Sequence, residues 1–159
     1  MKPRPPTLRP DWRYVLARIA PSYRVPDGKT LYLAIAEAVT ALFGDGGAPA
    51  IDQAVVAVER GHVIVRCRRG EEERLIAALA TITAIDGCAI AIHPRAVSGT
   101  IRSLRDRMVA PPEPVLVGED ADGGTVRQRF RIGASRSDVI VHDYKGERVV
   151  YFGTIDFEE

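Results

Sequence analysis

The spacing of apolar residues predicts an α+β protein: a ferredoxin-like βαββαβ sandwich with an antiparallel sheet, two helices on one face, a third helix and a C-terminal β extension. Three observations support this fold class. Short runs of branched and aromatic residues alternate with two segments of helical periodicity, glycine and proline separate them, and 46% of the 159 residues are hydrophobic. Such a chain can bury one sizeable core, so one main domain is expected.

The distribution of proline, glycine and charge predicts four parts. Residues 1–11 contain four prolines and should form an extended basic arm. The ferredoxin-like domain is expected at 12–108, a linker at 109–125 and a small β extension at 126–159. No apolar run approaches the roughly 18 residues of a membrane span, and the N-terminus is unlike a signal peptide, so a soluble cytoplasmic protein is expected.

The first strand is expected at 12–19, WRYVLARI, between two prolines. Alternation places Val15, Ala17 and Ile19 on one face and Leu16 on the other. Asp27 then caps a helix over KTLYLAIAEAVTALF, which the glycines at 44, 46 and 47 should end. The helix residues expected to face the core are Leu31, Ile35, Val39 and Leu42.

A hairpin should follow, with strands at 54–59 and 62–68 around Arg60-Gly61. In its second strand, an apolar face alternates with a face that carries arginines, which indicates a sheet covered on one side.

A second helix, ERLIAALATITAI, opens with three glutamates at 71–73, which suit the positive end of a helix dipole. The last core strand is expected at 88–93, halted by Pro94, and a third helix at 95–108. Beyond the linker, QRFRI, SDVIVHDY and ERVVYFGTI predict strands, of which the last two form a hairpin. An isolated hairpin is marginally stable, so it should dock on the core or on a partner.

Arginine dominates the cationic side chains, with nineteen arginines against three lysines in a chain of net charge +1. So small a net charge argues against a protein that coats nucleic acid through bulk electrostatics. Basic residues instead gather at 1–18 and 95–107, while 113–122 and 156–159 are acidic. Arginine forks suit bidentate contact with phosphate, although a GC-rich genome explains the arginine excess equally well.

No catalytic or metal-binding set of residues stands out. The two cysteines lack a Cys-x-x-Cys pair and read as buried thiols of a reducing cytoplasm. His62, His93 and His142 lack the spacing of a metal site. An enzyme that used His142 and Asp143 would depend on adjacent strand residues, which point to opposite faces. We therefore expect no catalytic residue and no metal ligand in this chain.

Two segments favour contact with RNA. The strand HVIVRCRRG lacks the aromatic residues that stack bases in an RNA-recognition motif. Arg66 and Arg68 would therefore contact phosphate and shape, or else form surface ion pairs with the helix acids. After the fourth strand, Ser98 or Thr100 can cap the third helix, whose free N–H groups could equally hold a phosphate. The flexible Gly99 and the arginines that follow favour the RNA contact.

Together these segments resemble the archaeal ribonuclease P protein component 2 family over about residues 3–108. The matching motifs are Pro5-Pro6-Thr7-Leu8-Arg9 with Arg13-Tyr14, then Arg66-Cys67-Arg68-Arg69-Gly70, and then Val97-Ser98-Gly99-Thr100-Ile101-Arg102. Asp11-Trp12 departs from the family, which usually has basic residues there.

The resemblance implies a protein subunit that supports the catalytic RNA of ribonuclease P in removing the 5′ leader of precursor tRNA. The RNA would hold the catalytic Mg²⁺ ions, and this chain would bind no cofactor. Expected partners are that RNA, the TIM-barrel component 3 and other subunits of the particle, with a homodimer left open. The expected RNA contacts are Arg9, Arg13, Arg66, Arg68, Arg69, Arg95, Ser98, Arg102 and Arg105. The expected partner contacts are two exposed apolar residues, Leu16 and Ile64.

The competing interpretation is a ferredoxin-like ligand-sensing or generic protein-interaction module, because this fold hosts many functions. Such a module would need a pocket between protomers with convergent polar groups, which the arginine-rich strand edge fits poorly. RNA that copurifies with the protein and is lost in high salt would separate the two interpretations.

Overall fold

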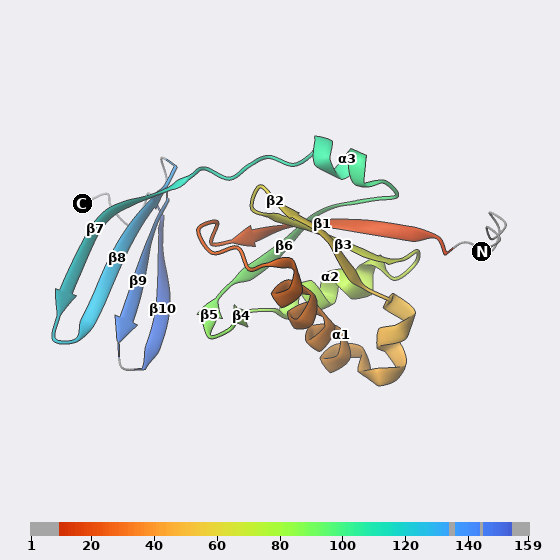
Figure 1. Ribbon diagram of the computed structural model, residues 1–159, viewed down its shortest axis with the longest axis horizontal. Coiled ribbons are helices and arrows are strands. Elements are labelled where there is room, and N and C mark those ends of the chain that lie inside the picture. Colours follow the sequence, from red (N-terminus) through yellow and green to blue (C-terminus); the bar gives the residue numbers. More distant parts are fainter. Residues whose placement is uncertain (1–9, 134–135, 144, 154–159) are drawn as a thin grey trace.

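The computed structural model describes residues 10–133, 136–143 and 145–153. Within these residues the chain forms two four-stranded antiparallel sheets, a two-stranded sheet and three helices, arranged as in Figure 1. The first part of the chain forms β1 (Trp12–Ala20), α1 (Gly28–Ile51), β2 (Ala54–Glu59), β3 (His62–Arg68), α2 (Glu72–Thr81), β4 (Ala84–Ile85), β5 (Cys88–Ala89), β6 (Ala91–Ser98) and α3 (Ile101–Asp106). The second sheet consists of β7 (Pro114–Asp122), β8 (Thr125–Ile132), β9 (Arg136–Asp143) and β10 (Gly146–Gly153). The predicted α+β class is confirmed.

The main sheet has the strand order β2-β3-β1-β6, with β1 antiparallel to both of its neighbours. Strands β2 and β3 form the predicted two-residue hairpin, in which Arg60 and Gly61 have φ angles of 51° and 69°. Positive φ at both turn residues matches the right-handed twist of the strands. In Figure 1, α1 and α2 lie below this sheet and α3 lies above it. The ferredoxin-like βαββαβ arrangement is therefore confirmed.

The core lies between this sheet and the two helices α1 and α2. Val15, Ala17 and Ile19 are fully buried and pack in one cluster with Leu31 and Ile35 of α1. Complete burial of a Val, Leu or Ile side chain contributes about 1.5–3 kcal/mol. The alternation of β1 and the helical spacing of α1 therefore fix which faces meet.

Helix α1 differs from its prediction at the C-terminal end. Asp27 caps its start as predicted, but the chain turns at Gly44, with φ 69°, and then re-enters a helix that continues to Ile51. Gly44 therefore kinks the helix and does not end it, because one residue of positive φ changes direction without preventing a further turn. Leu42, expected in the core, is 46% exposed, and Phe43 packs on the core instead. By length and composition alone α1 could cross a membrane, but its buried face belongs to the core.

Strand β6 is longer than predicted and passes through Pro94. Because β6 is an edge strand, a proline there can leave its missing N–H on the unpaired side. Ala17 pairs with Pro94 and Leu16 pairs with Ala96, so Arg95 is the extra residue of a β-bulge. The short β4-β5 hairpin replaces the end of the predicted second helix, residues 82–85, and the start of the predicted last core strand, residues 88–89.

Helix α3 begins at Ile101 and not at Arg95, because the preceding residues pair with β1. It covers the upper face of the main sheet, where Leu104 packs on Leu16 and Ile64. These two sheet residues are 1% and 0% exposed. The prediction that Leu16 and Ile64 are exposed partner contacts is therefore wrong: they face away from the first cluster as expected, but α3 buries them.

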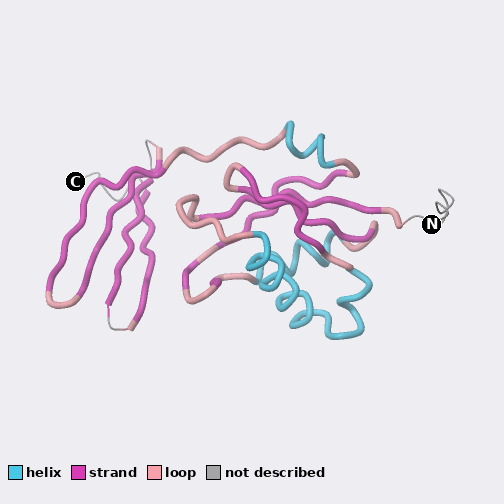
Figure 2. Tube along the Cα trace, in the orientation of Figure 1, coloured by secondary structure: helices cyan, strands magenta, loops and turns pink. Residues whose placement is uncertain are grey.

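The segment predicted as a linker, 109–125, is mostly strand, because β7 pairs with β8 in a sheet of order β10-β9-β8-β7. The predicted C-terminal strands are confirmed as β8, β9 and β10, while residues 154–159 lie outside the described residues. Figure 2 shows this sheet beside the main one. It docks through the loop after β1, where Tyr23 stacks on Phe130 with ring centroids 4.7 Å apart and Arg24 pairs with Glu147.

Candidate nucleic-acid interface

Three strand ends meet at the end of the main sheet where β1 begins (Figure 1). Because β1 is antiparallel to β3 and β6, its first residues lie beside the last residues of both. Trp12 pairs with Arg68, while Tyr14 pairs with Ser98 on one side and with Arg66 on the other. The register thus brings together predicted contacts from three separate motifs. We name the following residues the strand-end group: Arg13, Arg66, Arg68, Arg69 and Ser98.

Trp12 positions two of these arginines. The guanidinium carbon of Arg66 lies 3.9 Å from the centre of the Trp12 ring, and that of Arg68 lies 5.9 Å from it. A guanidinium over an indole face is stabilised by about 0.5–2 kcal/mol. The Nε of Arg66 is buried, with no hydrogen-bond partner among the described residues. Trp12, which departs from the family pattern, therefore holds an arginine in place, and the ring face beneath Arg66 is not open to a stacked base.

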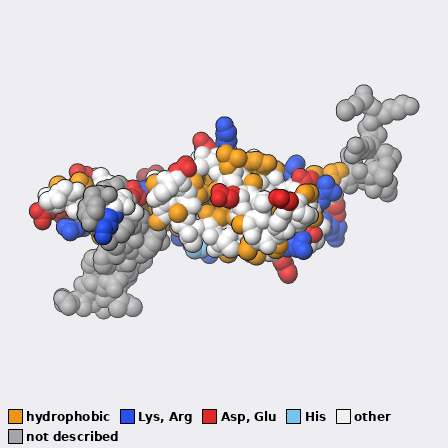
Figure 3. Space-filling view, turned by 90° about the horizontal axis from the view of Figure 1, so that it is seen from below, with side chains coloured by type: hydrophobic (Ala, Val, Ile, Leu, Met, Phe, Trp, Pro, Cys, Tyr) orange, Lys and Arg blue, Asp and Glu red, His pale blue; other side chains and the backbone are white. Residues whose placement is uncertain are grey.

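Carboxylates hold the other arginines of the strand-end group. The pairs are Arg13 with Glu72 at 3.5 Å, Arg68 with Asp52 at 3.2 Å and Arg69 with Asp11 at 2.8 Å. The hydrogen bond that Arg69 donates to the Asp11 carboxylate raises the pKa of Arg69, which keeps this guanidinium charged. Figure 3 shows basic and acidic side chains next to one another on the surface, at the right-hand end of the described residues.

The ion pairs of Arg68 and Arg69 are surface features, because their four side chains are 41–62% exposed. Exposed pairs typically contribute little to stability, so a phosphate can replace the carboxylate at small cost. Arg68 thus forms a surface ion pair, which was the predicted alternative to a phosphate contact. Its partner Asp52 is the C-cap residue of α1 and not an acid within a helix.

The turn after β6 uses the hydroxyl groups of its serine and threonine. Ser98 Oγ accepts a hydrogen bond from the Thr100 N–H at 3.2 Å, and Thr100 Oγ1 accepts one from the Ser103 N–H at 3.4 Å. Of the two predicted caps, Thr100 is the one that caps α3. A Cβ added to Gly99 would lie 3.2 Å from Nη1 of Arg13, so the absent side chain leaves room for that guanidinium. Capping accounts for this turn.

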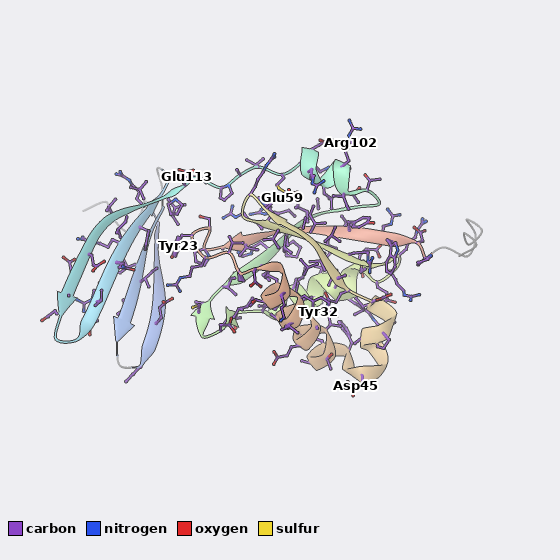
Figure 4. All side chains as sticks on the ribbon, viewed as in Figure 1. Tyr23, Tyr32, Asp45, Glu59, Arg102 and Glu113 are labelled. Atoms are coloured by element: carbon purple, nitrogen blue, oxygen red, sulfur yellow. The ribbon has the colours of Figure 1, made fainter. Side chains whose placement is uncertain are left out.

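Two further predicted RNA contacts lie on α3, away from the strand-end group. Arg102 is exposed and points away from the main sheet (Figure 4). Arg105 reaches β2, where its Nε donates to a carboxylate oxygen of Glu59 at 2.7 Å. Arg9 lies outside the described residues.

Arg95 lies in a third place, in a hollow that it lines together with Arg18 and Arg107. Arg18 was not among the predicted RNA contacts, and Arg107 entered the prediction only as one of the arginines that follow Gly99. The face of β1 on which Arg18 lies could be predicted from the sequence, because alternation places Arg18 on the same face as Leu16. The position of Arg107 depends on how α3 packs, which the pattern of the sequence does not report.

The thiol of Cys67 is not a reactive centre. Burial, followed by the charges of Glu72 and Glu71, raises its pKa to about 12, so it stays protonated at neutral pH. Cys88 is a half-buried free thiol. Within residues 10–133, 136–143 and 145–153, no group of three or more His, Cys, Asp or Glu side chains could hold a metal ion.

Comparison with known proteins gives consistent matches. The Rpp14/Pop5 family matches residues 13–109. The ribonuclease P protein component 2 of Methanosphaerula palustris is 42% identical over 160 residues, which cover 100% of this chain and 99% of the relative. The protein of the same name from Methanoculleus marisnigri is 40% identical over 164 residues, with the same coverage of 100% and 99%. The one from Methanocorpusculum labreanum is 45% identical over 111 residues, or 70% of this chain and 74% of the relative.

Among solved structures, a chain in a cryo-EM structure of yeast ribonuclease MRP aligns with 58% of this chain and 76% of its own length, at a TM-score of 0.48 and 13% identity. This likeness is too distant to support an inference. The family match, in contrast, includes the strand-end group, and the first two relatives align over the whole chain, C-terminal sheet included. This chain belongs to the Rpp14/Pop5 family.

Proposed function

We propose that this chain, a protein subunit of ribonuclease P, supports the catalytic RNA by direct contact and supplies no catalytic group of its own. One observation supports the contact surface above all: four arginines, on two neighbouring strands or directly after one of them, lie at one end of the sheet, inside the segment that matches the family. Removal of the 5′ leader of precursor tRNA would then be chemistry of the RNA, which would also hold the Mg²⁺ ions.

The physical basis of this role is neutralisation of crowded phosphates. Arg66 is ordered by Trp12 before RNA arrives, whereas Arg68 and Arg69 would exchange an exposed carboxylate for a phosphate. Each phosphate that is neutralised releases counterions, so the affinity should fall steeply with salt. Arg102 on α3, which forms no ion pair within the described part of the chain, would add a contact away from the strand-end group.

Protein partners need a different surface from the one predicted. We propose the TIM-barrel component 3 as a partner in the cytoplasm, with a homodimer as the alternative. Because Leu16 and Ile64 are buried, we take as apolar candidates two residues on the edge strands of the main sheet, Val56 on β2 and Val97 on β6, which are 40% and 38% exposed. Copurification of component 3 with wild type, and its loss with Val56→Asp or Val97→Asp, would identify the edge that is used.

Reconstituted cleavage tests the role of the chain. Precursor tRNA, the RNA subunit and the other protein subunits are combined with and without this chain over a range of Mg²⁺ concentrations. We expect stimulation that is strongest at low Mg²⁺, where protein must replace counterion screening. Arg68→Glu with Arg69→Glu should reduce the stimulation, while the matched pair Arg127→Glu with Arg131→Glu on β8 should not. Equal cleavage with and without the chain at every Mg²⁺ concentration would reject the role.

A further inference from the structure

We propose that a hollow beside α3 binds a single phosphate group of an RNA backbone, held by Arg18, Arg95 and Arg107. The hollow has a volume of about 350 Å³, and its lining also includes Leu16 and His62. Residues 109–112 form one wall. This inference rests on the proposed RNA-binding role and adds a site separate from the strand-end group.

Each of the three arginines comes from a different segment. Arg18 lies on β1 directly opposite His62 of β3, which places both on the face that α3 partly covers. Arg95 is the extra residue of the bulge in β6, and a bulge redirects the side chain of its extra residue. Arg107 is the C-cap residue of α3. The convergence is therefore a product of the fold and not of neighbouring sequence positions.

Within the described residues, no carboxylate neutralises the positive charge of the three arginines in the hollow. No Asp or Glu lines it, and in the part of the chain that the structure describes none of the three arginines forms an ion pair. Glu59 lies opposite His62 on β2, but Arg105 already holds its carboxylate at 2.7 Å. Like charges around one hollow repel, and an anion between them turns that repulsion into attraction.

The wall and floor of the hollow are held in place. A Cβ on Gly61 would lie 2.9 Å from Cγ of Pro111, so only glycine lets the segment 109–112 pack this closely on the β2-β3 turn. His62 is 5% exposed, and its Nδ1 donates to the carbonyl oxygen of Arg60 at 2.7 Å, which fixes the ring. A site that is already ordered loses little conformational entropy on binding.

The chemistry favours a phosphate. Guanidinium groups match phosphate oxygens bidentately, and three arginines line one hollow. No Phe, Tyr or Trp lines the hollow, so a base could not stack there. A hollow near the lower size limit of small-ligand sites suits a phosphate with part of its ribose. The carboxylates of an acidic peptide are the alternative occupant and form an arm of the test.

The experiment compares two charge-matched double variants of the full chain. Arg95→Gln with Arg107→Gln removes two exposed arginines of the hollow, and Arg127→Gln with Arg131→Gln removes two exposed arginines of β8. Affinity for the ribonuclease P RNA is measured between about 50 and 200 mM salt, together with hydroxyl-radical footprints. Poly-L-glutamate binding and the thermal midpoint are measured on the same samples.

The phosphate site is supported if the hollow variant lowers the slope of log affinity against log salt by about 1 and loses one short protected patch of RNA, while the β8 variant behaves like wild type.

Other results reject the phosphate site or the proposed function. If wild type binds the RNA and the hollow variant keeps the wild-type slope and footprint, the phosphate site is rejected while the proposed function stands. Loss of poly-L-glutamate binding with unchanged RNA binding would assign the hollow to a protein partner and also overturn it. If wild type itself fails to bind the RNA, the proposed function fails. A drop in the thermal midpoint as large as that of a core variant would make the two arginines structural, which again overturns the site.

Discussion

The strand-end group and the hollow beside α3 are both rich in arginine, but they differ in how the charge is neutralised. In the strand-end group, Arg13, Arg68 and Arg69 contact carboxylates, and Arg66 stacks on Trp12. Around the hollow, the arginines have no carboxylate partner among the described residues. Under the proposed function, the paired arginines are ordered in advance and would have to exchange a carboxylate for a phosphate to bind RNA. The arginines of the hollow would have no carboxylate to give up. What an arginine contributes to RNA binding thus depends on the contact it gives up.

The largest effect should come from Leu104→Ala, which removes the side chain that seats α3 on Leu16 and Ile64. Leu104 is fully buried, so the substitution should cost about 2–5 kcal/mol of the free energy of unfolding, measured in urea. A loosened α3 should displace Arg107 and lower the salt slope of RNA binding as the hollow variant does, while the strand-end contribution remains. The control is Leu33→Ala, the same substitution at a residue of α1 that is 56% exposed and lies outside both proposed sites. A cost below about 0.5 kcal/mol would show that α3 is not packed as described.

The next effect in size is a difference in stability between substitutions of two β3 arginines, Arg66 and Arg68. Arg66→Ala removes the contact with Trp12 and should cost about 1 kcal/mol of unfolding free energy. Arg68→Ala breaks an exposed pair and should cost less than about 0.5 kcal/mol. Both should weaken RNA binding in a filter assay. Equal stability losses for the two variants would contradict the distinction between a stacked and a surface-paired arginine.

Removal of a competing carboxylate should strengthen RNA binding slightly. Asp11→Asn leaves Arg69 without its partner, and we expect about two- to fivefold tighter binding at low salt, because an exposed pair no longer has to be broken. The control is Glu113→Gln, which removes an equal charge from a residue with no ion pair in the described structure. Unchanged affinity for Asp11→Asn would mean that the carboxylate does not compete with phosphate.

The smallest effect concerns the thiol of Cys67, which lies between Arg66 and Arg68 and reports whether a substitution opens β3. Because the pKa of Cys67 is raised to about 12, its thiol stays protonated at every pH well below that value and reacts slowly with alkylating reagents. At pH 8 we expect modification of Cys88 first, in wild type and in Arg68→Ala alike, as read by mass spectrometry. Rapid modification of Cys67 in Arg68→Ala would show that the substitution opens β3, so its effect on RNA could not be assigned to charge.

Much of the fold could be predicted because period-two alternation reports burial directly. The faces of β1 and the hairpin at Arg60-Gly61 are examples. The errors arose where a local signal has two outcomes. A glycine such as Gly44 can either end a helix or kink it. A proline such as Pro94 ends a central strand but is tolerated in an edge strand, and whether the strand lies at an edge depends on the strand order of the sheet.

The candidate site was predictable by residue type but not by arrangement. Arg66, Arg68 and Arg69 were identified from their motif, yet their grouping with Arg13 follows from the register of β1 against β3. Leu16 was assigned to a partner because the apolar face of α3 is too short to be recognised in the sequence. The hollow could not be predicted from the sequence, because its wall depends on a contact between residues 61 and 111, fifty positions apart.

The bulge in β6 also has an evolutionary consequence. On one side of it Pro94 stays aligned with Ala17, and on the other Ala96 stays aligned with Leu16, so Arg95 is a single inserted residue in an otherwise regular ladder. Deleting it would leave both halves of the strand in their present alignment and every neighbouring side chain on its present face. A lineage could therefore gain or discard this positive charge in one mutational step, without rebuilding the sheet.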